Sequence, residues 1–209
     1  MNPADRIPNW TQLRREASLL RRLIQRPPWI QQYEPHDVVT AIRAAFRRWA
    51  PAEQEPNLLM IAALWERLGN ESWMRELSEE ESRHVISRLA RSLHLFALAS
   101  EEGTACSSFG AACAFKPPKS KAPIVSVARF ARLVNQPPET PRRLEALSRV
   151  FRYFRQKGVR VKPDDAENLL IFLFTDDPKS VVSCWANDYF SHLEGATPES
   201  SKETAPDTV

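Results

Sequence analysis

The chain has 209 residues, of which 43% are hydrophobic and 26% are charged, a composition typical of a folded globular protein with room for a hydrophobic core. Only 5 glycines occur, which argues against glycine-rich phosphate-binding loops and against β folds with many turns. The formal net charge is only +3, and no apolar run approaches the ~20 residues that a membrane-spanning helix needs, so we expect no membrane segment.

The first half of the chain is expected to form four helices. Asn9 can cap the first helix through its side chain, and prolines separate the periodic segments. Ser78 and Glu81 have the spacing of a capping box at the start of the fourth helix. The expected helices cover residues 10–26, 36–50, 57–68 and 79–99.

Apolar residues recur at helical spacing along these segments and predict the buried face of each helix. On the third helix, the residues expected to face the core are Leu59, Ala62, Ala63 and Leu68. Four tryptophans of the chain lie on apolar stripes, and we expect them in the core rather than at a binding surface. They are Trp10, Trp49, Trp65 and Trp185.

Residues 103–123 form the one long stretch without a helical period. It starts with small and apolar residues, CSSFGAACAF, and continues as a basic linker, so we place a domain boundary within it. This divides the chain into an N-terminal helical bundle, residues 1–115, and a C-terminal helical bundle, residues 116–194. The last residues, 195–209, are rich in Ser, Thr, Glu and Pro and are expected to be disordered.

Four further helices are expected after the linker. No segment convincingly predicts a strand, with the possible exception of residues 159–161, which are too short to matter. Asp164 and Asp165 are expected to act as caps where the seventh helix opens. The predicted fold is therefore all-α, with two small bundles and about eight helices. On the fifth and sixth helices the expected core residues are Val127, Phe130, Ala131, Val134, Leu144, Leu147, Phe151 and Phe154.

Positive charge is concentrated in one part of the chain. Residues 116–162 hold 13 Lys and Arg against 2 Asp and Glu, whereas residues 163–209 hold 2 against 10. A local excess of +11 indicates a polyanionic partner, most simply a nucleic-acid backbone. Arginine suits this role because its planar guanidinium can bind two phosphate oxygens at once.

The predicted nucleic-acid-binding surface consists of the basic side chains of the linker and of the fifth and sixth helices. No aromatic side chain is obviously exposed beside them, which favours contact with the backbone over readout of bases. The alternative is a solvated helical face, partly neutralised by the two acidic helices that follow. The surface comprises Lys116, Lys119, Lys121, Arg129, Arg132, Arg142, Arg143, Arg149 and Arg152. A possible second basic face on the first helix comprises Arg14, Arg15, Arg21 and Arg22.

No catalytic or metal-binding set can be assembled from the sequence, so we expect no enzyme activity, no metal and no cofactor. The four histidines are scattered, and the adjacent acidic pairs precede helical segments, where acids act as caps. Cys106, Cys113 and Cys184 form no CxxC motif. With an odd number of cysteines and no predicted signal peptide, a reducing cytoplasm is the simpler location.

Five short motifs of the second half follow one another in a recognisable order. They are Ser108-Phe109-Gly110-Ala111-Ala112-Cys113-Ala114, Arg129-Phe130-Ala131-Arg132-Leu133-Val134, Leu147-Ser148-Arg149-Val150-Phe151, Val159-Arg160-Val161 and Trp185-Ala186-Asn187-Asp188-Tyr189-Phe190. Over about residues 85–190 this order resembles the small subunit of type I-E CRISPR Cascade complexes, called CasB. The chain departs from that family at Ala111, where an arginine usually follows the glycine, and this weakens any role of the segment in nucleic-acid contact.

The resemblance implies an all-α protein without enzymatic activity. It would be present as a pair of copies along a crRNA-guided complex, in contact with other Cascade subunits. Its basic surfaces would help to hold the crRNA and the target DNA and would steady the displaced strand, in the service of antiviral defence. The uneven charge distribution agrees with this implication.

Two other functions stay open at this point. A free-standing helical DNA-binding regulator would place one helix in a major groove and would bind one sequence tightly. A protein-interaction adaptor would use its basic face to dock an acidic protein and would show no appreciable affinity for nucleic acid.

Overall fold

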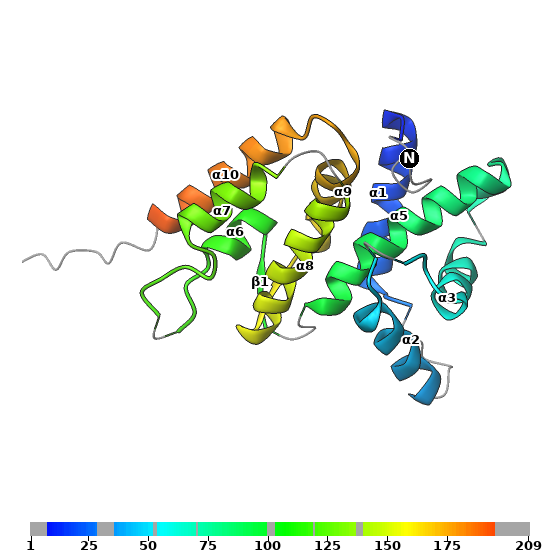
Figure 1. Ribbon diagram of the computed structural model, residues 1–209, viewed down its shortest axis with the longest axis horizontal. Helices are drawn as coiled ribbons and strands as arrows, with labels where there is room; N and C mark the ends of the chain where they lie inside the picture. Colours follow the sequence, from blue (N-terminus) through cyan, green and yellow to red (C-terminus); the bar gives the residue numbers. More distant parts are fainter. Residues whose placement is uncertain are drawn as a thin grey trace, which may run out of the picture.

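The computed structural model describes residues 8–28, 36–51, 54–69, 71–99, 103–118, 120–136 and 140–194. Within these residues the chain forms ten α-helices, a short 3₁₀-helix and one two-stranded sheet (Figure 1). The prediction of an all-α protein is confirmed apart from this small sheet. No helix in the described segments is long and apolar enough to cross a membrane.

Five helices make up the first half. The predicted caps are present: the Asn9 side chain accepts a hydrogen bond from the Gln12 N–H at 2.7 Å, and Ser78 and Glu81 form the complete capping box. The short helix Ser72–Arg75 is too short to show an apolar period, and the sequence does not predict it. The bounds are α1 (Trp10–Gln25), α2 (His36–Arg48), α3 (Leu58–Leu68), α4 (Ser72–Arg75) and α5 (Glu79–Leu98).

The second half contains five more helices and the sheet. The predicted irregular stretch 103–123 is wrong in its first part, since it holds a strand and a helix whose six residues are all buried. The bounds are β1 (Thr104–Cys106), α6 (Phe109–Ala114), α7 (Val127–Val134), α8 (Thr140–Gln156), β2 (Val159–Val161), the 3₁₀-helix (Pro163–Asp165), α9 (Ala166–Phe174) and α10 (Lys179–Glu194).

The sheet joins segments that are far apart in the sequence. Strand β1 pairs in parallel with β2, with Thr104 opposite Val159 and Cys106 opposite Val161. Residues 159–161, the one segment with a possible strand pattern, therefore do form a strand, and the expectation that they are too short to matter is wrong. Gly103 approaches the backbone of Gly158 so closely that a Cβ on Gly103 would lie 2.1 Å from the Gly158 carbonyl oxygen, and its φ of 124° also favours glycine.

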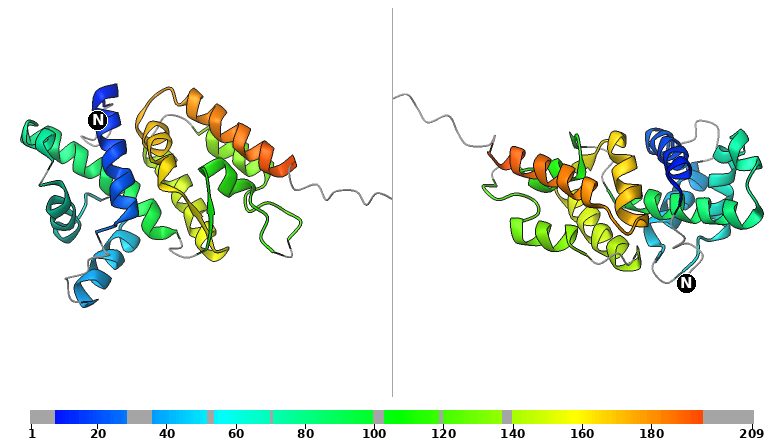
Figure 2. Two further views of the ribbon diagram at one scale, coloured as in Figure 1. Left: turned by 180° about the vertical axis from the view of Figure 1, so that it is seen from behind. Right: turned by 90° about the horizontal axis from the view of Figure 1, so that it is seen from above.

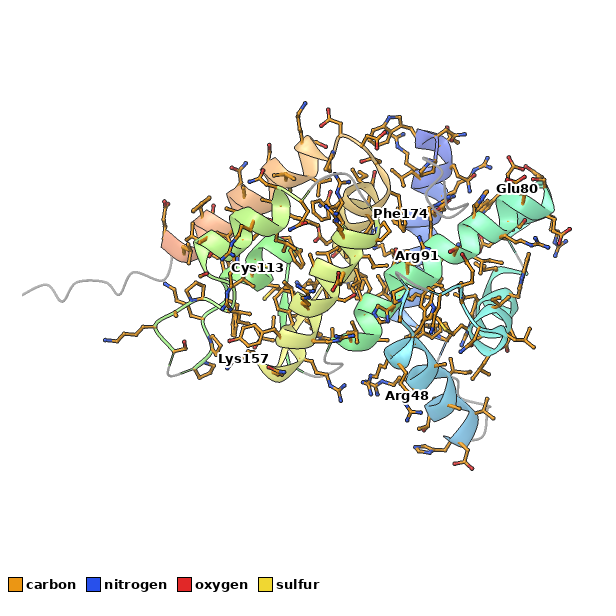
Figure 3. The ribbon with its side chains drawn as sticks, in the orientation of Figure 1. Arg48, Glu80, Arg91, Cys113, Lys157 and Phe174 are labelled. Atoms are coloured by element: carbon orange, nitrogen blue, oxygen red, sulfur yellow. The ribbon has the colours of Figure 1, made fainter. Side chains whose placement is uncertain are left out.

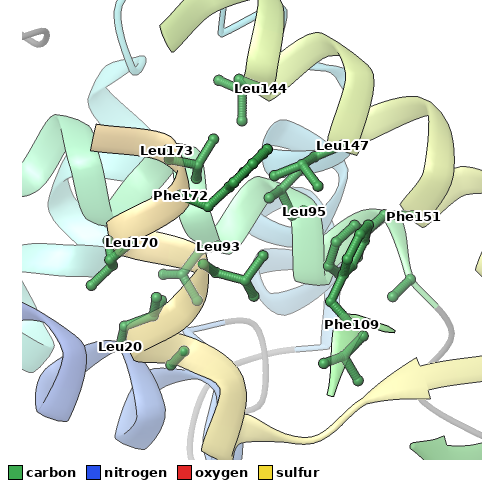
Figure 4. Close-up of a cluster of buried hydrophobic side chains, with 14 of the residues drawn as sticks. Leu20, Leu93, Leu95, Phe109, Leu144, Leu147, Phe151, Leu170, Phe172 and Leu173 are labelled. Atoms are coloured by element: carbon green, nitrogen blue, oxygen red, sulfur yellow. The ribbon is translucent and has the colours of Figure 1, made fainter. Parts of the chain in front are cut away.

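One hydrophobic core runs through both halves of the described structure. Helix α1 packs against α9, and α5 packs against α8. Figure 4 shows Leu20 of α1, Leu93 of α5 and Leu170 of α9 within the same cluster of buried side chains. The predicted stripe of α8 is confirmed, because its four apolar residues Leu144, Leu147, Phe151 and Phe154 are fully buried.

Several predicted core residues lie at the surface instead. Trp49 and Trp185 are buried as predicted, but Trp10 is 62% exposed and Trp65 is 41% exposed. Leu59 and Ala62 of α3 and Val127 and Ala131 of α7 are also exposed, so the buried face of each helix is turned relative to the predicted one.

The division into two bundles at residues 115 and 116 stays a prediction. Pairing of β1 with β2 and packing of α6 against α10 favour a boundary before residue 103. The predicted tail, 195–209, lies outside the described residues.

Candidate nucleic-acid interface

A groove of about 500 Å³ runs between α7 and α8. Arg129 and Arg132 line it from α7, and Arg149 and Tyr153 line it from α8. Its other lining residues are apolar or uncharged, and none of them is a carboxylate: Ile124, Val125, Leu133, Gln136, Ala146 and Val150. Three guanidinium groups on a partly apolar wall give the groove a positive potential.

Helix α7 presents its arginines to the groove because its apolar face is held by α10. Phe130 stacks on Tyr189 with ring centroids 4.3 Å apart and an angle of 9° between the rings. The Tyr189 hydroxyl donates a hydrogen bond to the Val125 carbonyl oxygen at 2.7 Å, which fixes the entry to α7. Arg129 and Arg132 are exposed beside this anchored face.

Helix α8 presents one polar stripe opposite its buried side. Arg142, Arg149 and Tyr153 are separated by seven and four residues, so they share a face of the helix. The Lys157 ammonium lies 5.4 Å from the centre of the Tyr153 ring, which extends the positive charge to the end of α8 (Figure 3). Arg149 pairs with Glu145, but both side chains are exposed, and an exposed pair of this kind contributes little to stability.

The remaining predicted surface residues are distributed around this groove. Arg152 is exposed on α8 but does not line the groove. The pKa of His94 on α5 is lowered mainly by burial and, to a smaller extent, by the charge of Arg152. Lys121 is exposed in the segment before α7, whereas Lys116 is half-buried and its ammonium donates to the Leu193 carbonyl oxygen at 3.4 Å. Lys119 lies outside the described residues.

Arg143 was predicted to lie on the exposed surface, and this is wrong. Its side chain is buried, and its guanidinium donates hydrogen bonds to the carbonyl oxygens of Phe172 at 2.9 Å and Thr175 at 2.6 Å. The same group lies 5.3 Å from the centre of the Phe172 ring. Burial lowers the pKa of Arg143. Arg143 therefore ties α8 to the C-terminal end of α9, where unpaired helix carbonyls need donors.

The second predicted basic face does not join the groove. Arg14, Arg15, Arg21 and Arg22 are all exposed on α1, which lies on the opposite face of the molecule from α7, beyond α9 (Figure 2). Three of them have partners within the chain. Arg21 pairs with Asp164, Arg22 pairs with Glu71 at 2.7 Å, and the Arg15 guanidinium lies 6.0 Å from the centre of the Trp73 ring.

The sequence interpretation missed Tyr153, which lines the groove, and Lys157, whose ammonium lies against the Tyr153 ring. The sequence indicates no aromatic side chain that is obviously exposed beside the arginines, and Tyr153, which lines the groove, is half-buried. Its separation of four residues from Arg149 is the signal that could have revealed it.

A metal site would bring several ligating side chains close together. Across the described residues, no three His, Cys, Asp or Glu side chains are placed to hold a metal ion.

The predicted cap Asp165 makes no cap hydrogen bond to α9. Its buried carboxylate instead accepts hydrogen bonds from the Phe109 N–H at 2.8 Å and the Trp185 Nε1–H at 3.0 Å. Burial raises the pKa of Asp165 to about 6, against the lowering effect of these donors.

Comparison with known families gives one match. The family described as CRISPR-associated protein Cse2 matches residues 42–190, which is more than half of the chain and includes every residue that lines the groove. Comparison with curated proteins and with solved structures gives no match.

Proposed function

The chain belongs to the CRISPR-associated protein Cse2 family, the family of the small subunit of type I-E Cascade, and on this basis we propose that it holds nucleic-acid backbone within that complex. Its proposed partners are the crRNA, the target DNA and the displaced strand, together with other Cascade subunits and a second copy of the chain. The protein would act by binding alone, in the cytoplasm, without a catalytic step.

The observation that supports this proposal most directly is the convergence of Arg129, Arg132 and Arg149 on one groove without a lining carboxylate. These residues come from two different helices, α7 and α8, so their meeting is a property of the fold and not of one basic helix. Each guanidinium can donate two parallel hydrogen bonds to phosphate oxygens. Arg142 shares the face of α8 with Arg149, and Lys157 lies against Tyr153, so both extend the charge along the α8 side of the groove.

The chemistry of the groove favours an unpaired strand. Tyr153 offers a ring on which one unstacked base can stack, and stacking of this kind does not depend on sequence. A DNA-binding regulator would place a single helix in a major groove, whereas the arginines of this groove come from two helices, α7 and α8. Sequence selection is left to pairing between guide and target.

The energetic role of such a subunit is modest but sufficient. Exchange of a DNA duplex for an RNA–DNA duplex is close to balanced in free energy. A few phosphate contacts to the strand that is set free can therefore shift the equilibrium toward the open state. The contacts formed by the groove would do this for any target sequence.

The test is binding of the purified chain to labelled single-stranded DNA, duplex DNA and RNA of unrelated sequence, across a salt series. Arg129→Glu/Arg149→Glu removes two groove arginines, and Arg155→Glu is the control, since Arg155 is exposed on α8 and does not line the groove. We expect weak, sequence-independent binding that falls steeply with salt, is lost in the double variant and persists in the control.

Two results would contradict the proposal. Tight binding to a single duplex sequence would identify a DNA-binding regulator. No binding by the wild-type chain at low salt would leave the groove as a docking surface for an acidic protein.

A further inference from the structure

A second pocket, of about 580 Å³, lies between α3 and α5, away from the basic groove. Its walls are mostly apolar, formed by Ile61 and Trp65 of α3 and Ile86 of α5. The Trp65 side chain is 41% exposed, so a large aromatic surface borders the opening. The other lining residues are Glu55, Pro56, Glu79, Ser82, Arg83, His84 and Ser87.

Two residues that line this pocket carry a buried polar side-chain atom without a hydrogen-bond partner. The Ser87 hydroxyl and His84 Nε2 are buried and make no hydrogen bond, although both residues line the pocket. A serine within a helix usually bonds to a carbonyl of the preceding turn when it is buried. A buried polar group without a partner is unfavourable, so an occupant that supplies donors or acceptors at this depth would be favoured.

The surroundings of the pocket are acidic. The residues that line it include two glutamates and one arginine. Glu55 and Glu79 line the pocket, Arg83 is paired with Glu79, and Glu80 lies beside them at the outer end of α5 (Figure 3). This charge repels a phosphate backbone and attracts Lys and Arg side chains.

We propose that this pocket docks a basic polypeptide segment of another subunit of the complex. The segment inserts one large apolar or aromatic side chain with a hydrogen-bonding tip between Trp65 and Ile86, and the tip reaches Ser87. Its neighbouring Lys or Arg side chains pair with Glu55 and Glu79. Aromatic anchors in a pocket with a polar rim are the usual centre of a protein interface. The proposal rests on membership of the Cascade complex and does not depend on the basic groove.

The experiment measures the affinity of the full chain for the crRNA-bound complex assembled without this subunit. Trp65→Ala removes the aromatic wall, and Leu58→Ala is the matched control, since Leu58 lies on the same helix, is 81% exposed and does not line the pocket. We expect Trp65→Ala to weaken association about 10-fold or more and Leu58→Ala to change it less than about 2-fold. Glu55→Lys reverses an exposed charge of the rim and is expected to weaken association several-fold.

A parallel measurement separates this site from the groove. Binding of the isolated variants to single-stranded DNA is expected to equal that of the wild type, so loss of assembly with unchanged DNA binding supports the pocket. Benzoylphenylalanine in place of Trp65 is expected to cross-link, in the assembled complex, to a polypeptide segment with Lys or Arg near the cross-linked residue.

Three outcomes would overturn the proposal. Wild-type association of both Trp65→Ala and Glu55→Lys would show that the pocket is not a docking site. A cross-link to nucleic acid, with reduced DNA binding by Trp65→Ala, would make it a base-binding site. A cross-link to a second copy of the chain would make it a self-association surface.

Discussion

Gly110 and Trp185 are in backbone contact where α6 crosses α10. A Cβ on Gly110 would lie 2.1 Å from the Trp185 carbonyl oxygen, well inside van der Waals distance. The neighbouring Phe109 ring packs on the Trp185 indole with centroids 4.7 Å apart. The glycine is therefore required by the closeness of two helices and not by its own backbone conformation.

Replacement of Gly110 by alanine is expected to destabilise the protein by about 3 kcal/mol or more, because the backbone of α10 must move away. Gly158→Ala is the comparison. Gly158 has a φ of 62° but no atom within 4 Å of an added Cβ, so only conformational strain of about 1–2 kcal/mol is expected there. Urea unfolding of the two variants measures the difference, and an equal loss in both would contradict the assigned contact.

The buried ion pair between Glu16 of α1 and Arg88 of α5 gives a second prediction. Both side chains are almost fully buried, and the Arg88 Nε–H donates to Glu16 Oε2 at 2.8 Å. Arg88→Met leaves a buried carboxylate without its cation and is expected to cost about 3–5 kcal/mol of stability. The double variant Glu16→Leu/Arg88→Met removes both charges and is expected to recover much of this loss. A double-mutant cycle by urea unfolding measures the coupling, and additive losses would refute it.

Acid pH is expected to act in opposite directions on two buried groups. Burial lowers the pKa of His94 from 6.5 to about 4, so the folded state binds fewer protons than the unfolded state, and stability falls as the pH drops from 6.5 to 4. Burial raises the pKa of Asp165 from 3.8 to about 6, so stability rises as the pH drops through the same range. Each effect amounts to about 3 kcal/mol.

Single substitutions should separate these two effects. Relative to wild type, His94→Asn should gain about 3 kcal/mol of stability between pH 7 and pH 4, because asparagine cannot be protonated there. Asp165→Asn should lose a similar amount over the same range, also relative to wild type. Chemical unfolding at a series of pH values gives the free energy of unfolding as a function of pH for the wild type and for both variants. Parallel curves for the three proteins would show that neither group titrates as assigned.

Salt dependence tests the basic groove residue by residue. If each groove arginine contacts one phosphate, its removal lowers the slope of log affinity against log salt by about 0.7 on single-stranded DNA. Arg129→Gln/Arg149→Gln should therefore reduce the slope by about 1.4, and Arg155→Gln should leave it unchanged. Tyr153→Leu should weaken binding with little change in slope, because stacking releases no counterions. A reduction of the slope by about 0.7 in Arg155→Gln would mean that only the total charge of the protein matters, and not the position of the arginine.

The sequence was most informative where local periodicity decides the structure. The stripe of Leu144, Leu147, Phe151 and Phe154 is buried as predicted, and the capping box of Ser78 is present. Arg143 was assigned to the wrong side even though its spacings of 4, 8 and 11 from Leu147, Phe151 and Phe154 place it on the apolar face. A positive charge alone favours the surface, but the carbonyl oxygens of Phe172 and Thr175 satisfy the buried guanidinium.

Other features could not be predicted because they depend on distant partners. Helix α6 has no polar face, since all of its six residues are buried, and a helix without an amphipathic pattern gives no periodic signal. Asp165 bonds to Phe109 and Trp185, which are 56 and 20 residues away, and nothing in its own neighbourhood indicates this. The groove itself required the relative placement of α7 and α8, so the sequence predicted its charges but not its walls.

The parallel pairing of β1 with β2 and the burial of α6 under α10 also set the order in which the protein can be completed on the ribosome. Residues 103–114 leave the exit tunnel before β2 and α10 have been translated, so this apolar segment has none of these partners at first. Contacts of such long sequence separation form late and slowly. A nascent chain that stalls before Lys179 would therefore expose α6 and be a substrate for chaperones or proteases, and only full translation through α10 would produce a protected molecule.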